Sequence, residues 1–244
     1  TGAAARTGEW AWIRDAIAEL LESHADPSGV RWMRDMLLWQ EVWRGGDVDG
    51  RPQAVVREAE ASGDPQALVN GCQWCLEEAF VQEDFASAAA FGRRLLEHEF
   101  AGPNIRFWAG RAALHHGDRA TAERVAATIE PSVGGACDGD VASLRAGLAA
   151  LEGRLDDALA GYRTALNVYR EMGLRFDVAM TGLDMAALVG PGQSAVRATA
   201  AEAREILVEL GATPVVERLD RLMASRPDAP GAPARSGSTV PVGS

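Results

Sequence analysis

A period of about 34 residues runs through most of this 244-residue chain. Small or apolar side chains recur at separations of 34, 34, 34 and 36 residues, each within a stretch of helical apolar spacing. We expect them to occupy the same place in successive second helices of helical hairpins: Leu20, Ala54, Ala88, Ala122 and Ala158. A repeat of this length is typical of stacked hairpins, because one hairpin alone cannot bury its apolar face.

The most complete unit of the series lies at residues 153–166. Gly153 is predicted to end one helix and Leu155 to begin the next, which carries Ala158, Tyr162 and Ala165 at helical spacing. This small–aromatic–small set resembles the second helix of a tetratricopeptide repeat. The sequence therefore predicts an all-α, tetratricopeptide-like superhelix (solenoid) of about five to six helical hairpins over residues 1–225. The Pro-, Gly-, Ser- and Ala-rich residues 226–244 are predicted to be a disordered tail.

Composition supports helices and narrows the classes of function. Alanine and leucine are abundant while β-branched and aromatic residues are few, so strands are poorly supported. A net charge of −11 disfavours contact with nucleic acid, whose phosphates repel an acidic surface. All 24 basic residues are arginine. Without lysine the segment cannot hold a Walker phosphate loop, a kinase site or a Schiff base.

No catalytic or metal-binding constellation stands out, so we expect no enzyme, cofactor or metal in this segment. Cys72 and Cys75 lack the second pair of ligands that structural zinc needs, which favours a role in the core. His115 and His116 are neighbours on a predicted helix and make a poor chelate, so a solvated helix end is favoured for them. Two aspartate pairs are interpreted as acidic turns: Asp47 and Asp49; Asp138 and Asp140. Three cysteines imply no disulfide framework, and no apolar run could span a membrane. A cytoplasmic location is expected.

The first helix of each hairpin should line the concave side of such a superhelix. Projecting the period along the chain gives a candidate partner-binding groove made of eight residues: Trp39, Trp43, Asn70, Gln73, Glu77, Asn104, Phe107 and Arg111. For these tryptophans and the others near the N-terminus a core role is the favoured alternative, because exposed aromatic patches are uncommon without a partner: Trp10, Trp12, Trp32 and Trp74. If these residues line a groove, we expect it to bind a protein or peptide partner, or the upstream domains of the same chain.

Four stretches in the C-terminal third carry a more particular resemblance: residues 165–174 (ALNVYREMGL), 183–186 (LDMA), 203–214 (AREILVELGATP) and 217–220 (ERLD). They resemble the C-terminal helical repeat region of large bacterial, actinobacterial-type signalling ATPases. These are class III adenylate/guanylate cyclases fused to an AAA-like ATPase, and related ATP-dependent transcriptional regulators. The resemblance implies a regulatory scaffold or docking region of a longer protein with its catalytic domains upstream. A structural spacer or a homodimerisation arm is the alternative.

Overall fold

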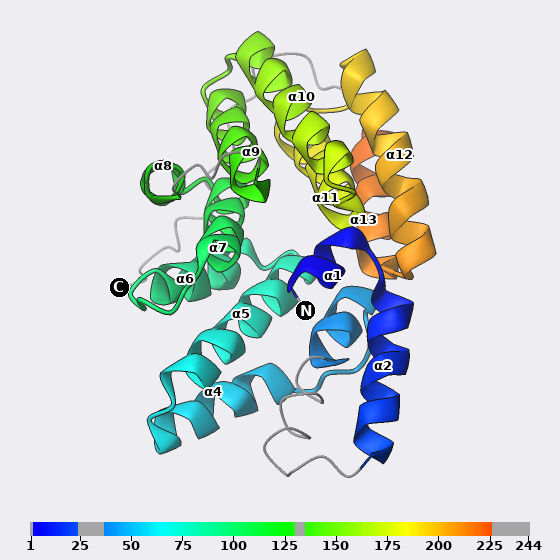
Figure 1. Cartoon of the computed structure of the whole chain (residues 1–244). Helices are drawn as coiled ribbons and strands as arrows, with labels where there is room; N and C mark the ends of the chain where they lie inside the picture. The colour runs from blue at the N-terminus through cyan, green and yellow to red at the C-terminus, as the bar shows by residue number, and fades with distance from the viewer. Residues whose placement is uncertain (1, 24–36, 130–134, 226–244) are drawn as a thin grey trace, which may run out of the picture.

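The computed structural model describes residues 2–23, 37–129 and 135–225 (Figure 1). Within these ranges the regular structure is helical and contains no strand, which confirms the all-α fold. Residues 37–44 are also helical, and the predicted tail at 226–244 lies outside the described residues. The other helices are α1 (Gly2–Thr7), α2 (Trp10–Glu22), α4 (Arg51–Ser62), α5 (Pro65–Val81), α6 (Phe85–Leu95), α7 (Pro103–His116), α8 (Arg119–Thr128), α9 (Ala136–Leu151), α10 (Leu155–Glu171), α11 (Arg175–Leu188), α12 (Ser194–Leu210) and α13 (Thr213–Ala224).

Local signals set many of the helix ends. The Asp64 carboxylate accepts hydrogen bonds from the backbone N–H groups of Gln66 and Ala67, which caps the start of α5. Asp84 and Asp118 cap α6 and α8 in the same way. At the other end of a helix, Gly63, Gly117 and Gly211 take positive φ values that a side chain would disfavour. Short turns therefore separate the helices and allow them to fold back on one another.

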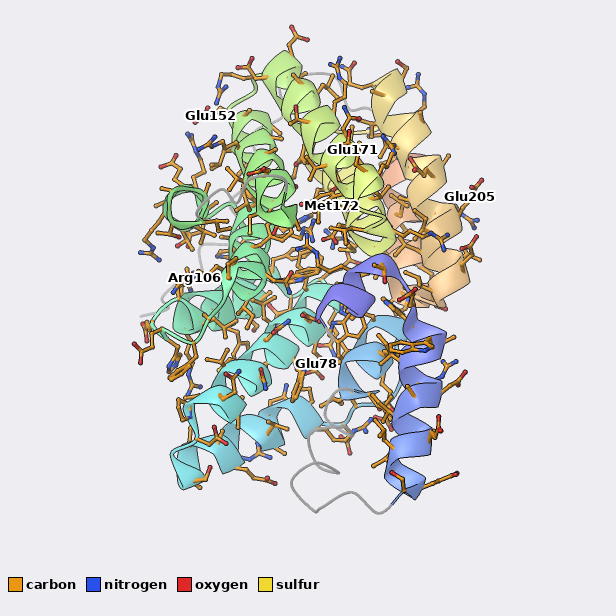
Figure 2. All side chains as sticks on the ribbon, viewed as in Figure 1. Glu78, Arg106, Glu152, Glu171, Met172 and Glu205 are labelled. Carbon is orange, nitrogen blue, oxygen red and sulfur yellow. The ribbon has the colours of Figure 1, made fainter. Side chains whose placement is uncertain are left out.

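The helices form two layers from α5 onward (Figure 1). Each helix packs on the next one along the chain, and alternate helices also touch, since α5 contacts α7, α7 contacts α9, α9 contacts α11, and α11 contacts α13. These five helices make an inner row, and α6, α8, α10 and α12 lie outside it. Figure 2 shows acidic side chains such as Glu152, Glu171 and Glu205 on the outer helices or their turns, and all three are exposed.

Small residues permit close approach inside these hairpins. In the hairpin of α9 and α10, a Cβ added at Gly161 would lie 2.9 Å from the Cβ of Ala146. The small–aromatic–small set of the same hairpin is completely buried, because Ala158, Tyr162 and Ala165 are each 0% exposed. The residues that identified the repeat in the sequence are thus the residues that pack its helices together.

One member of the proposed series is wrong. The four alanines are the fourth residues of α4, α6, α8 and α10, and three of them are fully buried. Leu20 is instead the eleventh residue of α2 and is 51% exposed. The periodic arrangement therefore begins at α4. Helix α2 does not belong to this series.

The N-terminal helices fold back toward the end of the array. Helix α1 packs on α11, and the Nε atom of Arg44 donates to the carbonyl oxygen of Leu210 at 3.1 Å. A cluster of rings fills the space between these parts of the chain, in which Phe176 contacts four tryptophans: Trp10, Trp39, Trp43 and Trp108. Trp10 and Trp43 are buried, so the core role of these two tryptophans is correct, while Trp12 is 64% exposed. Trp32 lies outside the described residues.

Candidate functional site

A cavity of about 430 Å³ lies on the inner side of the array, where α1, α2 and residues 37–44 meet α5, α7 and α11. Five aromatic side chains contribute to its walls, together with three amide side chains and three ionisable ones. The aromatic members are Trp39, Trp74, Phe100, Trp108 and Phe176, the amides are Asn70, Gln73 and Asn104, and the ionisable residues are Arg6, Glu77 and Asp177.

Five of the eight groove residues inferred from the sequence line this one cavity: Trp39, Asn70, Gln73, Glu77 and Asn104. The first turn of α7 supplies Asn104, and the middle of α5 supplies Asn70, Gln73 and Glu77. Asn70 accepts a hydrogen bond from Gln66 at 3.3 Å. The side-chain oxygen of Asn104 is buried and has no hydrogen-bond partner among the described residues.

The other three residues of the predicted groove are not on its surface, and their assignment to a partner-binding face is wrong. Trp43 is 0% exposed because the folded-back helix inserts it among Trp108 and Phe176. Phe107 is also 0% exposed and packs with residues of α8 and α9, such as Val125 and Leu144. Arg111 is 1% exposed and pairs with Asp184 of α11.

Glu77 contributes a buried carboxyl group to the cavity wall. It is 0% exposed and accepts hydrogen bonds from Trp43 Nε1 at 2.7 Å and from Gln73 Nε2 at 2.8 Å. Burial raises the pKa of Glu77 to about 7, although these hydrogen bonds oppose the change by stabilising the carboxylate. Near neutral pH its charge is therefore sensitive to any other charge that enters the cavity.

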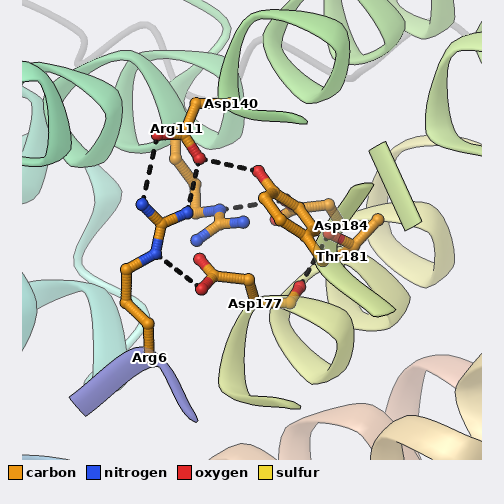
Figure 3. A network of polar contacts seen from close by, with 7 residues as sticks. Arg6, Arg111, Asp140, Asp177, Thr181 and Asp184 are labelled. Atoms are coloured by element: carbon orange, nitrogen blue, oxygen red, sulfur yellow. Dashed lines mark hydrogen bonds and ion pairs between the residues drawn. The ribbon is translucent and has the colours of Figure 1, made fainter. Parts of the chain in front are cut away.

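Beside the cavity, Arg6 of α1 bridges two inner helices (Figure 3). Its guanidinium contacts Asp177 on α11 at 2.7 Å and Asp140 on α9 at 2.6 Å. The hydroxyl of Tyr169 donates to Asp140 at 2.8 Å. Burial raises the pKa values of Asp140 and Asp177, and the Arg6 charge opposes this rise. The interpretation of Asp140 as part of an acidic turn is wrong, because it is fully buried within α9.

A second buried group continues the network toward α13. Asp184 accepts from Arg111 Nε at 2.9 Å and contacts Nε2 of His115 at 2.8 Å. Nδ1 of His115 lies 2.9 Å from a guanidinium nitrogen of Arg218. Because an arginine can only donate, Nδ1 accepts and Nε2–H donates to Asp184, which makes His115 a neutral tautomer. Burial lowers the pKa of His115 in agreement with this assignment. The predicted solvated helix end is thus wrong for His115 and correct for the exposed His116.

Sequence reasoning missed most of this charged network. Arg6 and Asp177 are 171 residues apart, and no local pattern connects them. A weaker signal was present in α11, where Asp177 and Asp184 lie two turns apart in a mostly apolar helix. Isolated carboxyls on such a helix need buried partners, because an unpaired buried charge is costly.

Comparison of the chain with protein-family models, curated proteins and solved structures finds no match. The site must therefore be interpreted from its own chemistry.

Across the three described ranges, no group of three or more histidine, cysteine or carboxylate side chains could hold a metal ion. Within those same ranges no helix has the length and apolar character needed to cross a membrane. Cys72 and Cys75 are buried, which confirms their core role, and burial raises the pKa of both thiols. What the cavity offers is a concave, aromatic binding surface with a few polar groups.

Proposed function

We propose that this chain is the partner-binding region of a larger cytoplasmic signalling protein. It is a tetratricopeptide-like superhelix that binds a segment of another protein, or of its own upstream domains, on the inner side of the array. In this proposal the segment has no catalytic role and transmits the binding event to the rest of the protein.

The cavity between α5, α7 and the folded-back N-terminal helices is the observation that carries the proposal. Its aromatic walls offer a large contact area, and buried aromatic anchors in pockets dominate the energetics of protein interfaces. Phe100 stands at its edge and is 49% exposed, so an apolar ring is available to a partner. The alternation of inner and outer helices supports the superhelical geometry in which such a surface is used.

Selection of binders from a displayed random-peptide library tests this function. We expect peptides that bind the wild-type chain and lose binding to Asn70→Trp, because the new indole occupies the cavity. Ala127→Trp is the matched control, since Ala127 is exposed on the outer helix α8. Retention of binding by Asn70→Trp, or the recovery of no binder, would contradict the proposal. Circular dichroism checks that both variants are folded.

A further inference from the structure

Carboxyl groups outnumber cations on the described part of the inner face. Four arginines lie in or beside the charged network, against five carboxyls, four of them buried: Arg6, Arg111, Arg218 and Arg221; Asp140, Asp177, Asp184, Glu77 and the exposed Glu83. His115 adds no charge as the neutral tautomer. The fold thus leaves negative charge on this face without a full complement of cations.

The cavity is where this excess can be neutralised. Two of the carboxyls, Glu77 and Asp177, border it, whereas Arg6 is the single cation on its described wall and already contacts two carboxylates. The buried oxygen of Asn104 adds an acceptor that lacks a donor. An occupant with a positive charge and several N–H groups would satisfy both deficits, because a buried acceptor without a donor costs free energy.

One feature of the cavity has the opposite sign. Gly102, Pro103, Asn104 and Ile105 bring the start of α7 to its wall, and a helix N-terminus is equivalent to roughly half a positive charge. That partial charge is smaller than the combined charge of Asp177 and the partly ionised Glu77 near neutral pH. It therefore reduces the preference for a cation without reversing it.

Guanidinium groups already fill equivalent positions nearby. Arg6 lies between Asp140 and Asp177 with its guanidinium carbon 5.7 Å from the centre of the Tyr169 ring. Arg111 lies 4.7 Å from the centre of the Trp108 ring while it pairs with Asp184. A planar guanidinium combines stacking on rings with several directed N–H donors, which an ammonium group cannot match.

We propose that the cavity binds the side chain of an arginine in the partner segment, with the guanidinium among the aromatic walls and near Asn104 and the carboxyls of Glu77 and Asp177. This inference rests on the proposed function, because it assumes that the partner is a polypeptide. It adds the chemical identity of the residue that the cavity recognises.

A titration of the full chain with blocked Gly-Arg-Gly and Gly-citrulline-Gly peptides tests the arginine inference. Nuclear magnetic resonance of the tryptophan indole N–H groups reports the binding. Citrulline has nearly the shape of arginine without its charge. We expect the arginine peptide to shift the indole signals of Trp39, Trp74 and Trp108, which line the cavity, and to leave the exposed Trp12 unchanged. The citrulline peptide should bind about tenfold more weakly, as expected for loss of a partly desolvated charge.

Two substitutions connect the binding to named groups. Glu77→Gln removes one carboxyl and should weaken the arginine peptide about fivefold, whereas the same substitution at the exposed Glu171 on α10 should leave it unchanged (Figure 2). Asn104→Asp places a carboxylate where an acceptor lacks a donor and should strengthen binding about fivefold. The second substitution keeps the test valid if the first one prevents folding.

Equal binding of the arginine and citrulline peptides would overturn the inference, as would shifts confined to Trp12. Tighter binding of a blocked Gly-Glu-Gly peptide would overturn it too, because the start of α7 would then control the sign of the ligand. Agmatine that binds as tightly as the arginine peptide would point to a small organic cation instead of a polypeptide side chain. The displayed library separates the two proposals: binders that depend on the cavity but carry no arginine would leave the proposed function intact and exclude an arginine site.

Discussion

At the scale of single residues, the buried polar groups of this protein show how burial and hydrogen bonding compete. Glu77, Asp140, Asp177 and Asp184 are all buried, yet the directions of their pKa shifts differ. Burial raises the pKa values of the first three. Asp184 alone contacts both a buried arginine and a histidine, and these partners lower its pKa despite its burial. Charged neighbours therefore decide which carboxyl is most strongly ionised.

The buried state of Glu77 predicts a pH-dependent contribution to stability. Its folded pKa of about 7 lies above its ordinary value of 4.5, so between these values the folded chain binds more protons at this site than the unfolded chain does. The contribution of Glu77 to the free energy of unfolding must then fall as pH rises from 4.5 through 7. Glu77→Gln should become more stable relative to wild type over this window, by on the order of 3 kcal/mol in total.

Urea denaturation at a series of pH values measures this difference. His115 contributes with the opposite sign, because its lowered pKa makes the folded chain bind fewer protons, but its contribution is common to both proteins and cancels. The exposed Glu171→Gln variant serves as the control and should differ from wild type by a constant amount. A difference between Glu77→Gln and wild type that does not change with pH would show that folding leaves the pKa of Glu77 near its ordinary value of 4.5.

At the scale of helices, glycines and alanines set how closely neighbours approach. Gly182 lies on α11, where an added Cβ would be 2.6 Å from the Cβ of Ala203 and 3.0 Å from the carbonyl oxygen of Thr199 on α12. The second contact involves backbone, which cannot rotate away as a side chain can. The spacing of α11 and α12 therefore depends on the absence of a side chain at this position.

Gly182→Ala should destabilise the fold by about 1–3 kcal/mol, because overpacking outweighs the higher helix propensity of alanine. Gly192→Ala is the control, since a Cβ there meets no atom within 4 Å and its φ is not positive. That variant should be neutral or slightly stabilising. The midpoints of urea denaturation for the two variants measure the effect, and equal midpoints would mean that the α11–α12 contact relaxes freely.

At the scale of the whole molecule, the N-terminal helices alter what a helical repeat array would otherwise be. Repeat arrays are stabilised by contacts between neighbours along the chain. Here Arg6 contacts Asp140 and Asp177, and Arg44 reaches Leu210, so residues far apart in the sequence stabilise one another. We expect the described array to unfold as one cooperative unit and not hairpin by hairpin.

Substitution of Arg6 by methionine tests the long-range contact. The change leaves two buried carboxyls without their cation and should lower the free energy of unfolding by about 3–5 kcal/mol at pH 7. The loss should be smaller in acid, where Asp140 and Asp177 become neutral. Arg14→Met, on the exposed face of α2, should change it by less than about 0.5 kcal/mol.

Hydrogen exchange locates the effect of Arg6→Met. In a cooperative fold, protection should fall in α9 and α11 as well as in α1, and it should fall by similar factors. Loss of protection confined to α1 would show that the N-terminal helix is a separate, weakly coupled element. The same result would mean that the inner helices are stable enough to fold without α1.

The sequence by itself determined the helices, the hairpins from α4 onward and five of the residues that line the cavity. These features follow from short-range rules: aspartate caps, glycine at helix ends, and a period that places Asn70, Gln73, Glu77 and Asn104 on one side of the array. Only the tertiary structure decided the return of the N-terminus, the burial of Trp43 and the pairing of Arg6 with Asp140 and Asp177. Such contacts depend on where distant helices meet after the array has curved. The angles between neighbouring helices add up along the array and set that meeting point. The spacing of residues within a single hairpin does not encode their sum.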